Sequence, residues 1–308
     1  MTLQFHLNES MKRTQEDTYR KRPSLWGVTF ICIGLFILAP LVVAAISALF
    51  ILPFALGKPS HTFISILFSE NMTYLISILT FPVLLLFVLL VNHKHYHKSF
   101  ASLGFYSINW KKKYAIGAGL GFATLLIVYV LNLIFQSLSI HINPKFNFFL
   151  FIAVLVGYLI QGMTEEVLFR GFIMNIFSSR KGVLFGIIAS SIFFAIMHMG
   201  NPGSQFLAII NIFIFGLVFA LLFYWSNNIW LTGAAHSLWN FTMGPILGIP
   251  VSGQRDMTSL FLTHVNTHRS FINGGSFGLE GGIIVTIIGI ILCIILWQLC
   301  RKKGLITN

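Results

Sequence analysis

A small set of polar side chains lies in otherwise apolar stretches of this 308-residue sequence. They are Glu165, Glu166, Arg170, His198, His236 and Asn240. Ionisable groups in such stretches are costly and usually face a bundle interior or a wet cavity. A carboxylate or imidazole can take a proton from water, while fixed donors stabilise the oxygen on which charge develops. Hydrolysis of a peptide bond is therefore the reaction that this set of side chains favours.

The spacing of the first three residues separates the two carboxylates. Successive residues on a helix are about 100° apart, whereas residues i and i+4 share a face. Glu166 is therefore predicted to pair with Arg170, and Glu165 to point away from that pair. One carboxylate would be neutralised and held, and the other left available for chemistry. His236 and Asn240 share a helical face by the same rule.

The composition places these side chains in a lipid bilayer. Hydrophobic residues make up 56% of the chain and charged residues 9%, with a mean hydropathy of +0.84. Soluble domains carry about 25% charged residues. A secreted disulfide scaffold, a disordered regulator and a nucleic-acid module are excluded, even though the net charge is +12. In a membrane protein such a basic excess reports topology and anionic lipid more often than nucleic acid.

Apolar segments separated by charged or Gly- and Pro-bearing breaks must position the polar residues. Eight can be read, at about 25–56, 71–92, 114–137, 148–178, 183–199, 207–225, 229–247 and 281–300. The first contains Pro40 and Pro53 and is expected to be a single tilted, kinked crossing. The predicted fold is an all-α, polytopic integral membrane bundle of about eight transmembrane helices.

The basic residues predict the orientation of this bundle. With the N-terminus in the cytoplasm, 16 of the 20 Lys and Arg residues fall on the cytoplasmic side. The four on the other side are Lys58, Lys145, Arg255 and Arg269. We therefore expect a cytoplasmic N-terminal segment at 1–24, a transmembrane catalytic bundle at 25–300 and a cytoplasmic tail at 301–308.

The depth of the polar residues gives a further expectation. The fourth segment, 148–178, is longer than the hydrocarbon layer at about 1.5 Å per residue, so we expect it to protrude into the cytoplasm. That offset would bring His198 and His236 to similar levels. It predicts a cavity between the middle of the membrane and the cytoplasmic side.

Three motifs in this order resemble those of a known family. Glu165-Glu-x-x-x-Arg170, Phe194-x-x-x-His198 and His236-x-x-x-Asn240, on consecutive hydrophobic segments, are similar to the motifs of the CPBP family. That family comprises type II CaaX prenyl endopeptidases and bacteriocin-processing or self-immunity proteins, also called Abi proteins. The resemblance covers about 150–245. The later Gly-rich stretch 273–282 looks like the segment before the last span in many bacterial members.

The resemblance implies a role for each motif residue. Glu165 would be the general base, and His198 would help to hold and activate the water. His236 and Asn240 would bind the developing oxyanion, while the neighbouring glutamate–arginine pair would organise the site. A desolvated carboxylate suits a base that works near neutrality.

Neither the residues nor the resemblance decides whether a metal ion takes part in the reaction. Glu165, His198 and His236 are chemically adequate for a His₂Glu zinc site, although no H-E-x-x-H helix is present. Three histidines at 93, 95 and 97 could also bind metal, but the lysines in the same connection favour a lipid-facing loop. No nucleotide or organic cofactor is indicated.

The expected protein is an intramembrane endopeptidase that cleaves a peptide near the cytoplasmic side of the membrane. Its substrate would be a peptide or a lipidated protein, cleaved in CaaX-type, leader-peptide or bacteriocin processing or in self-immunity, in contact with membrane lipid and without nucleic acid. The Ile-, Phe- and Asn-rich character is typical of a bacterial cell-membrane protein. The alternatives are a non-catalytic bacteriocin immunity protein and an ion- or proton-coupled transporter, although no internal repeat supports the latter.

Overall fold

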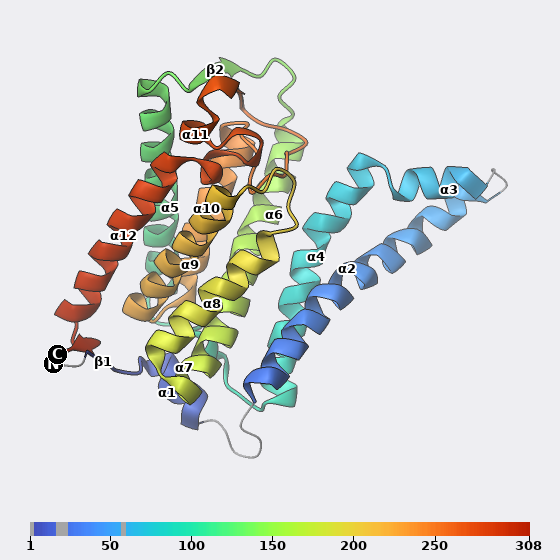
Figure 1. Ribbon diagram of the computed structural model, residues 1–308. Coiled ribbons are helices and arrows are strands. Elements are labelled where there is room, and N and C mark those ends of the chain that lie inside the picture. Colours follow the sequence, from blue (N-terminus) through green and yellow to red (C-terminus); the bar gives the residue numbers. More distant parts are fainter. Residues whose placement is uncertain (1–2, 17–23, 57–59) are drawn as a thin grey trace.

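A computed structural model describes residues 3–16, 24–56 and 60–308. Each of the eight apolar segments forms a helix, so that the predicted all-α membrane bundle is confirmed (Figure 1). These helices are α2 (Leu25–Ala55), α4 (Glu70–Leu90), α5 (Trp110–Ile134), α6 (Phe148–Glu166), α8 (Val183–His198), α9 (Phe206–Ser226), α10 (Ile229–Phe241) and α12 (Ile283–Lys302).

Within the described residues, six helices are long and apolar enough to cross a membrane. The fourth of them is the longest, because α6 continues through the π-helix η3 (Val167–Met174) into α7 (Asn175–Lys181) and makes a span of 34 residues. Helices α8 and α10, with 16 and 13 residues, are shorter. The chain is therefore an integral, multi-pass membrane protein.

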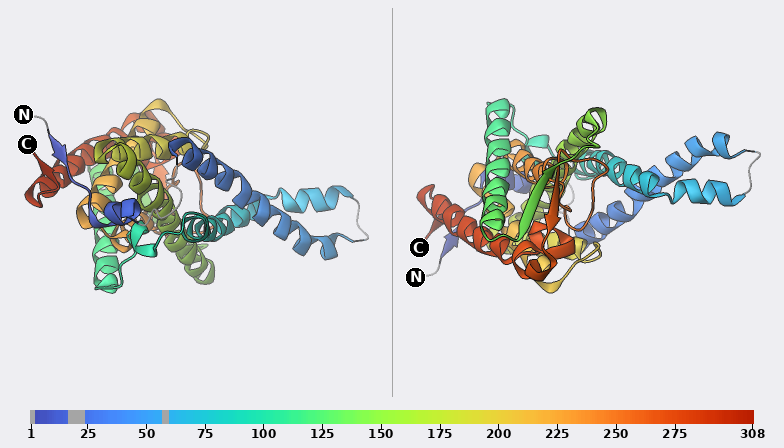
Figure 2. Two further views of the ribbon diagram at one scale, coloured as in Figure 1. Left: turned by 90° about the horizontal axis from the view of Figure 1, so that it is seen from below. Right: turned by 90° about the horizontal axis from the view of Figure 1, so that it is seen from above.

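The first apolar stretch forms an arm that leans away from the other helices. Helix α2 is one continuous helix despite Pro40 and Pro53, as expected, and it is followed by the short helix α3 (Ser60–Leu67) and by α4. The arm diverges from the bundle toward α3 (Figures 1 and 2). Nearer its base, Phe36 of α2 packs against Phe169 of η3, with ring centroids 6.1 Å apart.

The two chain ends meet at one end of the bundle. Strand β1 (Gln4–Phe5) pairs antiparallel with β4 (Ile306–Thr307), and α1 (Glu9–Glu16) packs nearby against α7. The Tyr224 hydroxyl lies 2.7 Å from the carbonyl oxygen of His6 and 2.6 Å from that of Leu305. A second antiparallel pair, β2 (Leu138–Ile142) with β3 (Phe261–Val265), covers the opposite end (Figure 1).

Glycines bring α10 close to its two main neighbours, α5 and α6. A Cβ atom at Gly117 or Gly121 of α5 would lie 2.0 Å from a backbone carbonyl oxygen of α10. A Cβ at Gly162 of α6 would lie 2.5 Å from the Ser237 nitrogen. Small residues spaced by four positions let helix backbones approach closely in membranes. These contacts fix the position of α10, which carries His236 and Asn240.

We expect Gly121→Ala to displace α10 and to lower both stability and activity. The added methyl group has no room against the Ala235 carbonyl oxygen, which belongs to rigid backbone. Overpacking of this kind costs about 1–3 kcal/mol. Thermal unfolding in detergent, compared with Gly119→Ala, tests the prediction, because Gly119 faces open space. Equal melting temperatures for the two variants would contradict it.

Candidate active site

The two glutamates are the last residues of α6, where the helix passes into the π-helix η3. Wider turns of this type occur frequently at functional sites, because they change the direction in which side chains point. Glu166 is fully buried, and Glu165 is 7% exposed. The chain therefore places two adjacent carboxylates in the interior of the bundle, each in a different environment.

Glu166 belongs to a buried ion cluster. Nη1 of Arg170 donates to Oε1 of Glu166 at 2.7 Å, and both side chains have no exposed surface. This confirms the predicted i,i+4 pair. Nδ1 of His236 lies 2.9 Å from the same oxygen, and Nη2 of Arg170 donates to the Gly216 carbonyl oxygen at 3.0 Å. The cluster joins α6, η3, α9 and α10.

Aromatic rings enclose this cluster. The ring of Phe219 stacks on His236 with centroids 4.7 Å apart, and Phe194 packs edge-on against the same imidazole. The guanidinium carbon of Arg170 lies 4.6 Å from the centroid of Phe194. Rings of this kind exclude water and lower the local dielectric, which strengthens the electrostatic interactions between the charged groups. The imidazole of His236 is consequently fixed in both position and direction.

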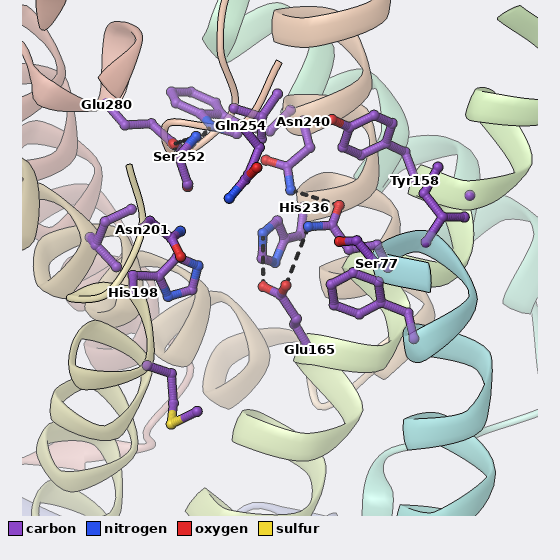
Figure 3. A pocket seen from close by; sticks show the side chains of 18 of the residues that line it. Ser77, Tyr158, Glu165, His198, Asn201, His236, Asn240, Ser252, Gln254 and Glu280 are labelled. Atoms are coloured by element: carbon purple, nitrogen blue, oxygen red, sulfur yellow. Dashed lines mark hydrogen bonds and ion pairs between the residues drawn. The ribbon is translucent and has the colours of Figure 1, made fainter. Parts of the chain in front are cut away.

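Glu165 is directed into the space that these contacts leave open, as predicted (Figure 3). Its Oε2 lies 3.6 Å from Nε2 of His236. Its Oε1 accepts from Nε2 of Gln161 at 3.3 Å, and Oε1 of Gln161 accepts from Nδ2 of Asn240 at 3.2 Å. Among the described residues, Oε2 of Glu165 and Oδ1 of Asn240 have no hydrogen-bond partner. Glu165 and Asn240 are thus each held by a hydrogen bond with Gln161, and each has one oxygen atom without a hydrogen-bond partner among the described residues.

Gln161 is a member of the site that the sequence motifs do not contain. It links Glu165 of α6 to Asn240 of α10. A signal for it exists in the sequence, because Gln161 precedes Glu165 by four positions in an apolar helix and therefore shares its face.

His198 lines the same cavity from its other side. It is the last residue of α8, and Figure 3 shows it near Asn201 and across the cavity from Glu165. Its Nδ1 lies 2.8 Å from the carbonyl oxygen of Phe194. If Nδ1 carries the proton and donates to that carbonyl, Nε2 is the acceptor of the ring. The structure thus brings all six predicted residues to one region: four are in direct contact, Asn240 is linked to them through Gln161, and His198 faces them across the cavity.

The cavity has a volume of about 720 Å³. Its floor contains Glu165 and His236, and aromatic side chains form much of its wall. These are Phe36, Phe68, Phe81, Phe169, Phe194, Phe215 and Phe219. Polar side chains, among them Ser77, Tyr158 and Gln254, also line it, so that the cavity offers both apolar and polar surface to a ligand (Figure 3).

Two carboxylates secure the loop that follows α10 over this cavity. Glu280 accepts from Nε1 of Trp239 at 3.0 Å and from the amide and hydroxyl of Ser252 at 2.9 and 2.7 Å. Asp256 accepts from the hydroxyls of Tyr74 at 2.8 Å and Tyr158 at 3.0 Å. Burial raises the pKa of the Asp256 carboxyl to about 6, against the opposing effect of the two hydroxyls. Neither carboxylate belongs to the three sequence motifs.

The comparisons with known proteins agree with this geometry. Residues 147–242 match the family model described as type II CAAX prenyl endopeptidase, Rce1-like. This part of the chain is an Rce1-like domain. The resemblance drawn from the three motifs is therefore confirmed, and with it the assignment to membrane-embedded peptide hydrolases. No curated protein and no solved structure matches the chain.

A zinc ion does not fit the Rce1-like domain well. In the part of the chain that the structure describes, no three His, Cys, Asp or Glu side chains are grouped so that they could hold a metal ion. The two nitrogens of His236 face Glu166 and Glu165, and His198 lies across the cavity. The residues that the structure describes therefore do not fit a His₂Glu zinc site.

We expect Gln161→Leu to lower kcat of the Rce1-like domain without unfolding it. Leucine removes both hydrogen bonds that hold Glu165 and Asn240, while it keeps a similar volume. Misplacement of reacting groups by about 1 Å can cost about 100-fold in rate. Peptidase kinetics measure the effect, and Gln161→Glu, which keeps an acceptor toward Asn240 but places a second carboxylate at Glu165, serves as the comparison. Unchanged kcat in the leucine variant would refute a positioning role.

Proposed function

We propose that the chain is a glutamate-dependent intramembrane endopeptidase in which Glu165 is the general base. The observation that carries this proposal is the environment of Glu165. Its carboxylate lines the cavity, its Oε2 lies 3.6 Å from Nε2 of His236 and has no hydrogen-bond partner among the described residues, and its neighbour Glu166 is neutralised by Arg170. The resemblance to the CPBP family supports the same assignment.

In the first step, water is activated by Glu165. Oε2 accepts one proton of the water, and the water oxygen forms a bond to the carbonyl carbon of the peptide. His198 faces this space, and its Nε2 can accept a hydrogen bond from the O–H group that the water keeps, which orients the attack. A positioned carboxylate of this kind contributes about 10²–10⁴-fold to a reaction rate.

The oxyanion formed in that step is stabilised by donors of α10. Nε2 of His236, when protonated, and the second hydrogen of the Asn240 amide are directed to the same space as Glu165. The charge on the imidazole is offset by the carboxylates on its two sides. Glu165 then returns its proton to the amine as the C–N bond breaks, so that the base is regenerated.

The substrate that this site supports is a peptide segment with apolar character. The family name refers to prenylated CAAX tails, and the cavity's aromatic wall accommodates either a lipid chain or apolar residues. Leader-peptide or bacteriocin maturation, and self-immunity based on such cleavage, use the same chemistry. All of these roles require hydrolysis, whereas a non-catalytic immunity protein does not.

The proposal is tested with the purified protein in detergent and a library of apolar and prenylated peptides. We expect cleavage at an internal peptide bond, with two fragments whose masses add to that of the substrate plus one water. Absence of cleavage for the whole library by folded protein would refute the proposed function.

We expect a chelator to leave this activity unchanged. The described side chains form no metal cluster, and Glu165 has a protein environment that can support a base on its own. Cleavage rates with and without EDTA, after dialysis against chelator, measure the effect. A rate that falls with EDTA and is restored by zinc would contradict the prediction.

A further inference from the structure

The two ends of the bundle carry unequal numbers of basic residues. The end that holds both termini carries twelve of the basic residues that the structure describes. They are Lys12, Arg13, Lys94, Lys98, Lys111, Lys112, Lys113, Arg180, Lys181, Arg301, Lys302 and Lys303. The opposite end carries three in the described ranges, Lys145, Arg255 and Arg269. Short connections rich in Lys and Arg stay in the cytoplasm.

The catalytic cavity opens toward the end with few basic residues. His198 is the last residue of α8, and Asn240 is the last but one of α10, and both helices run away from the termini. The cavity is also lined by Asn201 of the α8–α9 connection and by Ser252 and Glu280 of the α10–α12 connection. Among the described residues, the connections at the basic end supply no lining residue.

From these two observations we infer that the cavity opens on the non-cytoplasmic face of the membrane. The α10–α12 connection, which contains β3 and α11 (Ser270–Asn273), contributes Val251, Ser252 and Gln254 to the lining at the mouth on that face. The orientation rests on charge and helix direction alone. The identity of the substrate rests in addition on the proposed peptidase function.

Two expectations drawn from the sequence are incompatible with each other. Cytoplasmic termini and cleavage near the cytoplasmic side exclude each other, because the termini and the cavity mouth lie at opposite ends. The charge distribution supports cytoplasmic termini, so the side of cleavage is the expectation that changes.

This orientation selects a substrate class. A prenyl group is attached to proteins in the cytosol, so a prenylated tail would meet the basic end and not the cavity mouth. A peptide that has crossed the membrane, or a membrane segment whose end protrudes on the far side, meets the mouth directly. The aromatic wall favours an apolar stretch in such a peptide.

Cysteine labelling tests the orientation without reference to activity. Cys32, Cys293 and Cys300 are replaced by alanine, and single cysteines are introduced as Met257→Cys at the mouth or Lys112→Cys at the basic end, two exposed positions. A membrane-impermeant maleimide is applied to right-side-out and inverted vesicles. We expect at least about tenfold preference for position 257 in right-side-out vesicles and for position 112 in inverted ones. The reverse pattern would overturn the inference.

Reporter cleavage separates failure of the orientation from failure of the function. An apolar peptide tethered to the membrane is displayed on either face in cells that produce the wild type or Glu165→Gln. We expect wild-type cleavage of the exported reporter only. Cleavage of the cytoplasmic reporter alone would overturn the substrate class. If neither reporter nor any library peptide is cleaved, the proposed function fails, while the labelling result still decides the orientation.

Discussion

Glu165→Gln is expected to reduce peptide cleavage by about 100- to 10,000-fold while the fold is kept. Glutamine has the same shape and retains an acceptor for Gln161, but its amide cannot take a proton from water. Because Glu165 lines a cavity and is not ion-paired to Arg170, its neutralisation weakens only the 3.6 Å contact with His236 and leaves the Glu166–Arg170 pair intact. The variant therefore separates chemistry from structure.

Steady-state kinetics and thermal unfolding of the same preparations measure both effects. The activity of His198→Ala is expected to fall less than that of Glu165→Gln, because His198 orients the water without taking its first proton. Full activity of Glu165→Gln would exclude this carboxylate as the base. A variant that loses activity and melting temperature together would point to a structural role instead.

Removal of the buried guanidinium is expected to destabilise the whole protein. In Arg170→Met, the Glu166 carboxylate keeps only His236 as a charged partner and remains without exposed surface. Breaking a buried ion pair on one side typically costs about 3–5 kcal/mol, because a charge stays buried without compensation. Unfolding by denaturing detergent measures the loss.

A second substitution distinguishes this cause from simple loss of packing. Glu166→Gln combined with Arg170→Met removes both charges and preserves the volumes, so we expect at least half of the lost stability to return. Activity should stay low in the double variant, since His236 loses the carboxylate that fixes its ring. A double variant as unstable as Arg170→Met would show that the charge on Glu166 is not the cause.

Local helical geometry explains which features could be predicted from the sequence. The Glu166–Arg170 pair and the opposite direction of Glu165 follow from the positions of neighbours on one helix, and the structure agrees with both. The apolar segments could be read in the same way, because hydrophobic length is a property of each segment alone. The expected role of Glu165 stays a prediction until it is measured.

Contacts between helices explain what could not be predicted. Gln161 joins Asn240 only because Gly162 and two glycines of α5 let α10 approach, and the sequence does not give the register of that approach. The contact of Glu280 with Ser252 depends on the path of a long connection. The side on which the cavity opens depends on how far each helix reaches, which composition does not specify.

The pairing of β1 with β4 has a consequence for the order of folding. Gln4 meets Thr307, so this contact closes a loop of almost the entire chain. Closing a long loop costs conformational entropy before the contact stabilises anything. Strand β1 can find its partner only after β4 has left the ribosome, and the Tyr224 hydroxyl then ties the carbonyls of His6 and Leu305. The β1–β4 pair therefore forms after the helices between the two strands are already inserted.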